Sequence, residues 1–183
     1  MRRSKYSPSE SMTDELNCRS KTMRVSLLRH GVAEARSDAG DFERMLVPRG
    51  FEQARLAAAR LQSLGTMLPD RVLCSPALRT RQTAESLIET LALPPACLEL
   101  ILPLYLAEIG TLNAIIQHVA TARDAAVTTQ PQHILLVGHN PGLSQLAQHL
   151  GAQLPTHELA TGALVSGELN QAGTIADPFV LIT

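Results

Sequence analysis

The segment HILLVGHNPG at residues 133–142 combines a short apolar run with the turn that ends it. The apolar run, residues 133–137, has the length of a strand buried on both faces and is too short for an ordinary helix. Asn140 and Pro141 follow as a capping residue and a proline, which are favoured where a helix begins. The segment therefore predicts a strand, a polar turn and then a helix over residues 143–150.

Strands and helices alternate on both sides of this segment. Short apolar runs predict further strands at residues 25–28, 71–74, 163–169 and 179–182. Apolar residues at helical spacing predict helices at residues 49–64, from Ser75-Pro76 to Leu91, and at residues 112–120. Residues 98–106 contain a proline and predict an extended connection, and residues 125–132 predict a polar loop. The alternation predicts an α/β fold, a three-layer sandwich with a mostly parallel central sheet.

The first residues differ in character from the rest of the chain. Residues 1–22 are polar and rich in Ser, Arg and Lys, so we expect a flexible leader there and one folded domain over residues 23–183. No apolar stretch follows Arg2, Arg3 and Lys5, so the pattern is not that of a secretory signal. Apolar runs are also far shorter than the ~20 residues that cross a bilayer, and we expect no membrane association.

Composition narrows the class of function. The chain has a formal net charge of −1 and contains no Trp, 2 Tyr and 3 Phe. It therefore lacks both the basic surface and the aromatic platforms that nucleic-acid binding uses. Its three cysteines, Cys18, Cys74 and Cys97, have no CxxC spacing, which argues against a disulfide framework and a cysteine zinc site. A reduced, cytoplasmic location is expected.

Three of the predicted strands end in turns that carry cationic or imidazole side chains. These turns are Arg29-His30-Gly31, the stretch from Ser75 to Arg79, and Gly138-His139. Ligands of open α/β sheets bind at the carboxyl ends of the strands, so the three turns are expected to converge on one pocket. Each turn taken alone is also compatible with a structural role, as a surface turn or a helix cap.

Together the two arginines and two histidines favour a phosphoryl group as the ligand. The imidazole of His30 can attack phosphorus, and Arg29 offers planar paired donors for phosphate oxygens. Arg79 lies in the first turn of a predicted helix, where the helix dipole disfavours a cation unless an anion is bound nearby. Metal binding by His30 and His139 is a rival interpretation, but no carboxylate or cysteine stands beside them at ligand spacing. We expect neither a metal nor another cofactor.

In their order along the chain, the motifs resemble those of the histidine phosphatase superfamily, also called phosphoglycerate mutase-like. Within it the chain is most similar to the SixA-type branch of phosphohistidine phosphatases. The segments that carry the resemblance are Leu28 to Gly31, Arg44 to Leu46 with Gly50, Ser75 to Ala84, Leu104 to Ala107, Val137 to Gly142, and Thr161 to Leu164.

The resemblance implies a role for each residue of the expected pocket. His30 would take the phosphoryl group and form a covalent phosphohistidine intermediate. Arg29 and Arg79 would hold the phosphate oxygens, and His139 would complete the pocket and stabilise charge in the transition state. Arg44 is a further phosphate-binding candidate at the rim. Water would then hydrolyse the intermediate and release inorganic phosphate, without a metal.

The resemblance also exposes a missing group. Many members of the superfamily protonate the leaving alcohol with a glutamate, whereas this chain has Leu104-Tyr105-Leu106 where that acid is expected. Glu99 and Glu108 are the nearby carboxylates, and Glu108 is the better candidate. A pocket without an acid suits the P–N bond of phosphohistidine, because imidazole leaves more readily than an alkoxide.

Three hypotheses follow from these residues. The first is a phosphatase that acts on phosphohistidine of a protein partner, such as a phosphotransfer domain. The second is a phosphatase of a small phosphomonoester or sugar phosphate, with Glu108 as its acid. The third is a phosphate-binding pseudoenzyme. The sequence identifies neither the natural partner, nor the oligomeric state, nor the role of residues 1–22.

Overall fold

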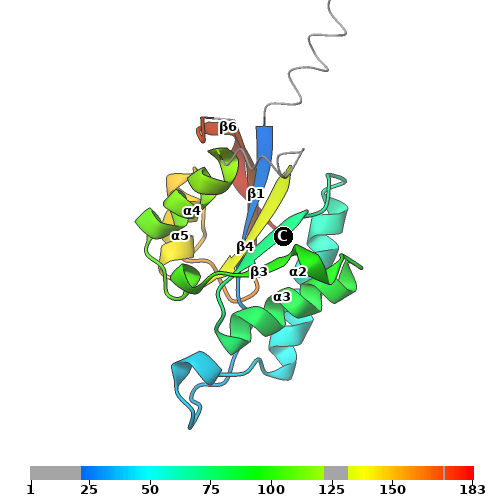
Figure 1. The fold of residues 1–183 in the computed structure, drawn as a ribbon, viewed down its shortest axis with the longest axis vertical. Helices are drawn as coiled ribbons and strands as arrows, with labels where there is room; N and C mark the ends of the chain where they lie inside the picture. The colour runs from blue at the N-terminus through cyan, green and yellow to red at the C-terminus, as the bar shows by residue number, and fades with distance from the viewer. Residues whose placement is uncertain (1–21, 122–131, 171) are drawn as a thin grey trace, which may run out of the picture.

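A six-stranded sheet forms the middle layer of the molecule (Figure 1). The computed structural model describes residues 22–121, 132–170 and 172–183. Along the sheet the strand order is β3-β2-β4-β1-β5-β6. The strands are β1 (Thr22–Arg29), β2 (Arg71–Cys74), β3 (Leu98–Leu100), β4 (His133–Gly138), β5 (Leu164–Asn170) and β6 (Ile175–Ile182).

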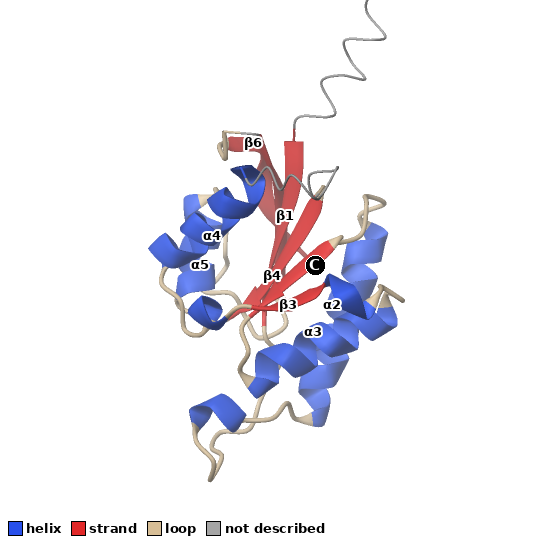
Figure 2. Cartoon of the chain, viewed as in Figure 1, coloured by secondary structure: helices blue, strands red, loops and turns tan. Residues whose placement is uncertain are grey.

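Helices cover both faces of this sheet and complete a three-layer sandwich (Figure 2). They are α2 (Pro48–Ser63), α3 (Leu78–Thr90), α4 (Ile109–Thr121) and α5 (Gly142–His149). One core contains apolar side chains of α2 and α3, and the other contains those of α4 and α5. Successive residues of β1 pack into opposite cores, since Leu27 belongs to the α4–α5 core and Leu28 to the α2–α3 core.

The strand pairing confirms the α/β fold with a mostly parallel sheet. β1 pairs with β4, β4 with β2, and β2 with β3 in parallel, whereas β5 and β6 extend the sheet in antiparallel fashion. All six residues of β4 are buried, which accounts for the uninterrupted apolar run in its sequence. The carboxyl ends of β1, β2 and β4 therefore lie along one edge of the sheet.

Two short 3₁₀ helices lie beyond that edge. They are η2 (Asp41–Glu43), in the connection between β1 and α2, and η4 (Leu102–Leu104), between β3 and α4. A third, η3 (Pro95–Cys97), connects α3 to β3. The prediction of an extended connection over residues 98–106 was thus wrong in part. Residues 98–100 add a strand to the sheet edge, and Pro103 lies in a 3₁₀ turn, where a missing backbone N–H is tolerated.

Two predicted helix starts were also displaced. Helix α3 begins at Leu78 with Ala77 as its N-cap, so Ser75 and Pro76 precede the helix rather than open it. The hydroxyl of Thr80 donates to the carbonyl oxygens of both Ser75 and Ala77, which ties this turn to the helix. The Ser75 hydroxyl is consequently available for another contact.

Asn140 does not cap α5 either. Pro141 is the N-cap, and the helix begins at Gly142. The side chain of Asn140 instead accepts from the hydroxyl of Ser144 and donates to the carbonyl of Leu159. It therefore joins the helix to the segment that leads into β5.

Other expectations concern residues outside the described ranges. The predicted leader, except for Thr22 in β1, and most of the predicted loop at residues 125–132 lie there. Within the described ranges, no helix combines the length and apolar character that crossing a membrane requires.

Two glycines allow the start of α2 to approach the end of β1. A Cβ atom on Gly31 would lie 2.4 Å from the carbonyl oxygen of Gly50, and one on Gly50 would lie 2.2 Å from that of Val32. Both obstacles are backbone atoms, so no side-chain rotation relieves them. This close approach holds α2 against the turn that contains His30.

We expect the substitution Gly50→Ala to lower the free energy of unfolding by about 1–3 kcal/mol, because the added methyl group forces two backbone segments apart. Gly110→Ala is the matched control, since a Cβ atom at Gly110 in α4 meets no atom within 4 Å. Urea unfolding of both variants checks the prediction. Equal stability of the two variants would show that the close approach is unimportant.

Candidate active site

The sheet edge brings the four predicted residues together. Arg29 is the last residue of β1 and His30 follows it, Arg79 is the second residue of α3, and His139 directly follows β4. The imidazole centroids of His30 and His139 are 5.3 Å apart. The charges of Arg29 and Arg79 act on both imidazoles. His30, Arg79 and His139 are all buried.

His30 is held in the form that a nucleophile needs. Its Nδ1 lies 2.8 Å from the carbonyl oxygen of Gly31, and because a carbonyl only accepts, Nδ1 carries the proton. Nε2 is then left with its lone pair. Burial, followed by the charges of Arg79, Arg29 and Arg44, lowers the pKa of His30 to about 4. At neutral pH the imidazole is therefore uncharged.

His139 is held by Ser75, a residue whose place before a proline is typical of a helix cap. The Nε2 of His139 lies 2.8 Å from the hydroxyl oxygen of Ser75, which is fully buried. The ring of Tyr105 meets His139 nearly perpendicularly, with centroids 5.5 Å apart. Burial, then the charges of Arg79 and His30, lowers the pKa of His139 to about 3. Ser75 also follows a strand, in one of the three turns that were expected to converge. That place was the feature of the sequence that could have indicated its contact with His139.

Three buried nitrogen atoms of this pocket have no hydrogen-bond partner among the described residues. They are Nε of Arg29, Nε of Arg79 and Nδ1 of His139. A buried polar atom without a partner costs about 1–3 kcal/mol, so such atoms are rare in folded proteins. Three of them in one cationic pocket match a ligand rich in anionic oxygen atoms, such as a phosphoryl group.

Arg44 and Asp41 lie at the rim of the pocket. Arg44 donates from Nε to the carbonyl of Glu34 and from Nη1 to the Asp41 carboxylate, at 2.6 and 2.8 Å. Arg44 is thus engaged with the connection between β1 and α2, while its charge still acts on His30. Asp41 also contacts Arg79 and Tyr105. Neither Asp41 nor Tyr105 was singled out as a site residue from the sequence.

The two glutamates considered as acids occupy different settings. Glu99 in β3 forms a paired salt bridge with Arg71, at 2.6 and 2.7 Å. Glu108 is exposed just before α4, and its carboxylate makes no hydrogen bond or ion pair with the described residues. In the same ranges, no cluster of three or more His, Cys, Asp or Glu side chains could hold a metal ion.

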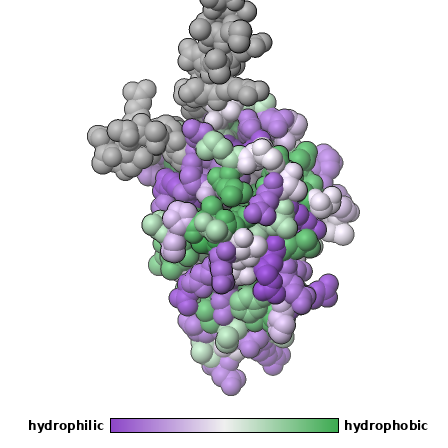
Figure 3. All heavy atoms as spheres, turned by 90° about the vertical axis from the view of Figure 1, so that its right-hand side faces the viewer, coloured by the Kyte–Doolittle hydropathy of each residue, from purple (hydrophilic) through white to green (hydrophobic). Residues whose placement is uncertain are grey.

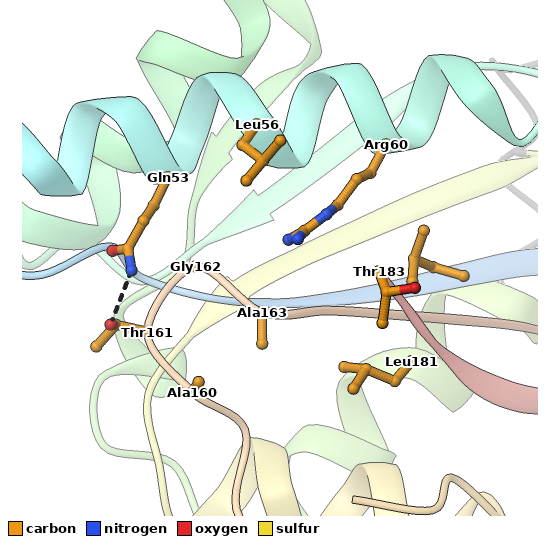
Figure 4. A pocket seen from close by; sticks show the side chains of 10 residues that line it. Gln53, Leu56, Arg60, Ala160, Thr161, Gly162, Ala163, Leu181 and Thr183 are labelled. Atoms are coloured by element: carbon orange, nitrogen blue, oxygen red, sulfur yellow. Dashed lines mark hydrogen bonds between the residues drawn. The ribbon is translucent and has the colours of Figure 1, made fainter. Parts of the chain in front are cut away.

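A glutamine from α2 supports the backbone that follows His30. The Gln53 side chain accepts from the N–H of Val32 at 2.8 Å and donates to the hydroxyl of Thr161 at 3.2 Å (Figure 4). The N–H of Gly162 is shared between the carbonyl oxygens of Arg29 and His30. The backbone of the turn that contains His30 is therefore held from two directions.

A cavity of about 260 Å³ lies beside this support, between α2 and the end of β6. Gln53, Thr161 and Gly162 are in its wall, and the guanidinium of Arg60 extends toward it from α2 (Figure 4). On the side of the molecule where α2 lies, apolar patches are interspersed with polar groups (Figure 3). The cavity is separate from the histidine pocket, since no residue of that pocket lines it.

Comparison with known proteins agrees with this geometry. The family model described as histidine phosphatase superfamily (branch 1) matches residues 25–101. Phosphohistidine phosphatase SixA of Escherichia coli (strain K12) is 30% identical over 151 residues, which cover 82% of this chain and 88% of that protein. This chain belongs to the histidine phosphatase superfamily. Its resemblance to the SixA-type branch is confirmed by the same relative.

Two further relatives support membership of the histidine phosphatase superfamily. An uncharacterized protein of Picosynechococcus sp. is 34% identical over 139 residues, covering 75% of this chain and 78% of that protein. The solved structure of the protein histidine phosphatase SixA complexed with tungstate has a TM-score of 0.67 and 28% identity, covering 87% of this chain and 94% of that one. The relatives therefore support phosphatase activity for this chain.

The depressed imidazole pKa values predict how stability depends on pH. In the unfolded chain an imidazole takes up a proton near pH 6.5, whereas folded His30 does so near pH 4. Between these values the unfolded state binds more protons, so the free energy of unfolding falls as pH drops from 6.5 toward 4. Urea unfolding at pH 7.5, 6.0 and 5.0 measures this slope. We expect His30→Asn to make this dependence on pH less steep. An unchanged slope would contradict the low pKa of His30.

Proposed function

We propose that this chain hydrolyses the P–N bond of phosphohistidine on a protein partner. The observation that carries the proposal is a neutral His30, with Nε2 available, beside three buried nitrogen atoms that have no hydrogen-bond partner in the described part of the chain. The relative from Escherichia coli is named a phosphohistidine phosphatase. We propose residues 23–183 as the catalytic domain and the cytoplasm as its location. The latter is supported by Cys74 and Cys97, which are buried and free.

The proposed reaction has two displacement steps. In the first, Nε2 of His30 forms a bond to phosphorus while the substrate P–N bond breaks and its electron pair goes to the leaving imidazole. In the second, water attacks the phosphorus of the intermediate, the bond to Nε2 breaks, and inorganic phosphate leaves. The guanidinium groups of Arg29 and Arg79 stabilise the charge on the phosphoryl oxygens in both steps. The Nδ1–H of His139 donates to the same oxygens while its Nε2 accepts from the Ser75 hydroxyl, and no metal enters either step.

Asp41, a carboxylate that the described residues place at the rim of the pocket, stays ionised and has no proton to donate, which favours the P–N bond as the substrate bond. Where the resemblance to the superfamily leads us to expect an acid, this chain has Leu104-Tyr105-Leu106, and the hydroxyl of Tyr105 donates to Asp41 at 2.8 Å. Among the nearby carboxylates, Glu99 is committed to Arg71 and Glu108 points to no described partner. An imidazole that takes its proton from solvent is expelled more readily than an alkoxide that receives no proton.

A protein partner, rather than a small molecule, is supported by the surroundings of the rim. Exposed apolar side chains lie next in sequence to the rim residues, namely Met45 beside Arg44 and Leu106 beside Tyr105. Leu102, in η4, is 68% exposed. Large apolar groups of this kind are common in protein interfaces and unnecessary for a small polar phosphoester.

We expect His30→Ala to reduce phosphate release from a phosphohistidine-bearing carrier protein by about 1000-fold or more, since the nucleophile is lost. His149→Ala is the matched control, because His149 is an exposed residue at the end of α5. Release is followed in EDTA, so activity that needs an added metal would contradict the metal-free mechanism. Tight binding of the carrier without release by the wild-type protein would instead indicate a phosphate-binding pseudoenzyme.

Glu108→Gln separates the two enzymatic hypotheses. If the P–N bond is the natural target, we expect kcat on the phosphohistidine carrier and on an alkyl phosphomonoester to change less than 3-fold. A general acid contributes about 100-fold or more to the cleavage of a poor leaving group. A loss of that size, confined to the alkyl ester, would favour a small phosphomonoester or sugar phosphate as the substrate.

A further inference from the structure

Asp41 holds both terminal nitrogens of the Arg79 guanidinium. Nη1 of Arg79 donates to the backbone carbonyl of Asp41 at 2.6 Å, and Nη2 donates to its carboxylate Oδ2 at 2.9 Å. The Nε of Arg79 is buried and has no partner among the described residues. Only 3% of the Arg79 side chain is exposed, so solvent does not replace the missing contact. One residue thus fixes the plane of the guanidinium and leaves one N–H unused.

Asp41 is itself held from two other directions. Oδ2 also accepts from the hydroxyl of Tyr105, and Oδ1 accepts from Nη1 of Arg44, both at 2.8 Å. The hydrogen bond from Arg44, and then that from Tyr105, keep the pKa of the Asp41 carboxyl far below its usual range. The carboxylate is therefore ionised at neutral pH. It joins the loop before α2 to the segment before α4.

A carboxylate in this place needs a physical explanation. An anion beside a pocket that binds phosphate repels the ligand, so charge alone disfavours it. Fixing a long arginine side chain in one orientation removes the entropic cost of ordering it when the ligand binds. The planar fork of a guanidinium makes such orientation especially effective for paired recognition of oxygens.

We propose that Asp41 is a positioning residue that orients Arg79 so that its Nε–H is presented to a phosphoryl oxygen. The inference rests on the proposed function only in taking a phosphoryl group as the ligand of the pocket. The opposite arrangement is a carboxylate that occupies the anion site itself and must leave before phosphate binds. The two arrangements predict opposite effects of removing the carboxylate.

The test measures binding of inorganic phosphate by calorimetry, together with kcat and KM for p-nitrophenyl phosphate. We expect Asp41→Ala to weaken phosphate binding roughly 10-fold and to raise KM more than it lowers kcat. Asp41→Asn keeps a side-chain oxygen acceptor and is expected to restore most of the affinity. Asp41→Ala leaves the buried guanidinium of Arg79 without its charge partner, so we expect this variant to unfold at a lower temperature than the wild type. Phosphate binding is therefore measured well below the unfolding midpoint of each variant.

Glu43→Gln is the matched control for charge. Glu43 lies in the same 3₁₀ turn, and its side chain makes no hydrogen bond or ion pair with the described residues. We expect it to change phosphate affinity less than 2-fold. Equal or tighter phosphate binding by Asp41→Ala would overturn the proposal in favour of a competing carboxylate.

Failure of the proposed function is distinguishable from failure of this inference. Wild-type protein that binds phosphate, loses affinity in Asp41→Ala, and does not release phosphate from the phosphohistidine carrier would retain the positioning role while refuting the substrate. Release that depends on His30, combined with an unaltered affinity in Asp41→Ala, would refute only the positioning role. Wild-type protein that neither binds phosphate nor releases it from the carrier would refute both.

Discussion

The parallel register of three neighbouring strands determines where the chemistry of this molecule lies. Arg29 pairs with Gly138 across β1 and β4, and Cys74 pairs with Val137 across β2 and β4. The three strands therefore end level with one another. Whatever residues follow them must meet, and the chain places an imidazole, a serine and a second imidazole at these ends. A slip of one residue in either pairing would turn these side chains toward the opposite faces of the sheet.

Burial then determines the charge state of the groups that meet there. Two imidazoles and two guanidinium groups this close together would repel one another strongly if all were protonated. Depressed imidazole pKa values remove two of these charges, the carbonyl of Leu159 accepts from Arg29, and Asp41 compensates Arg79. The remaining positive charge is what an incoming phosphoryl group neutralises. Folding and ligand recognition therefore use the same electrostatic balance.

The sequence predicted the layers, the parallel centre of the sheet and the convergence of four residues, because buried strands and turn residues leave strong local patterns. It did not predict what Ser75 and Asp41 contact. Serine before proline has the local chemistry of a helix cap, and only the tertiary position of His139 gives its hydroxyl a different partner. Asp41 lies in a polar connection without periodicity, and its contacts to Arg79 and Tyr105 span 38 and 64 residues of chain. Such contacts depend on loop paths that no local pattern encodes.

The site has two parts that differ in how well they tolerate substitutions. One is the turn that contains His30, which Gln53 and Gly162 support, and the other is the rim. The turn is tied by backbone hydrogen bonds to β4 and to the segment before β5, so that changes there disturb the fold. The rim depends on side-chain contacts between two surface connections. Substitutions in the rim can accumulate without loss of the reactive imidazole. A lineage can therefore exchange one phosphorylated substrate for another while it inherits the same reaction.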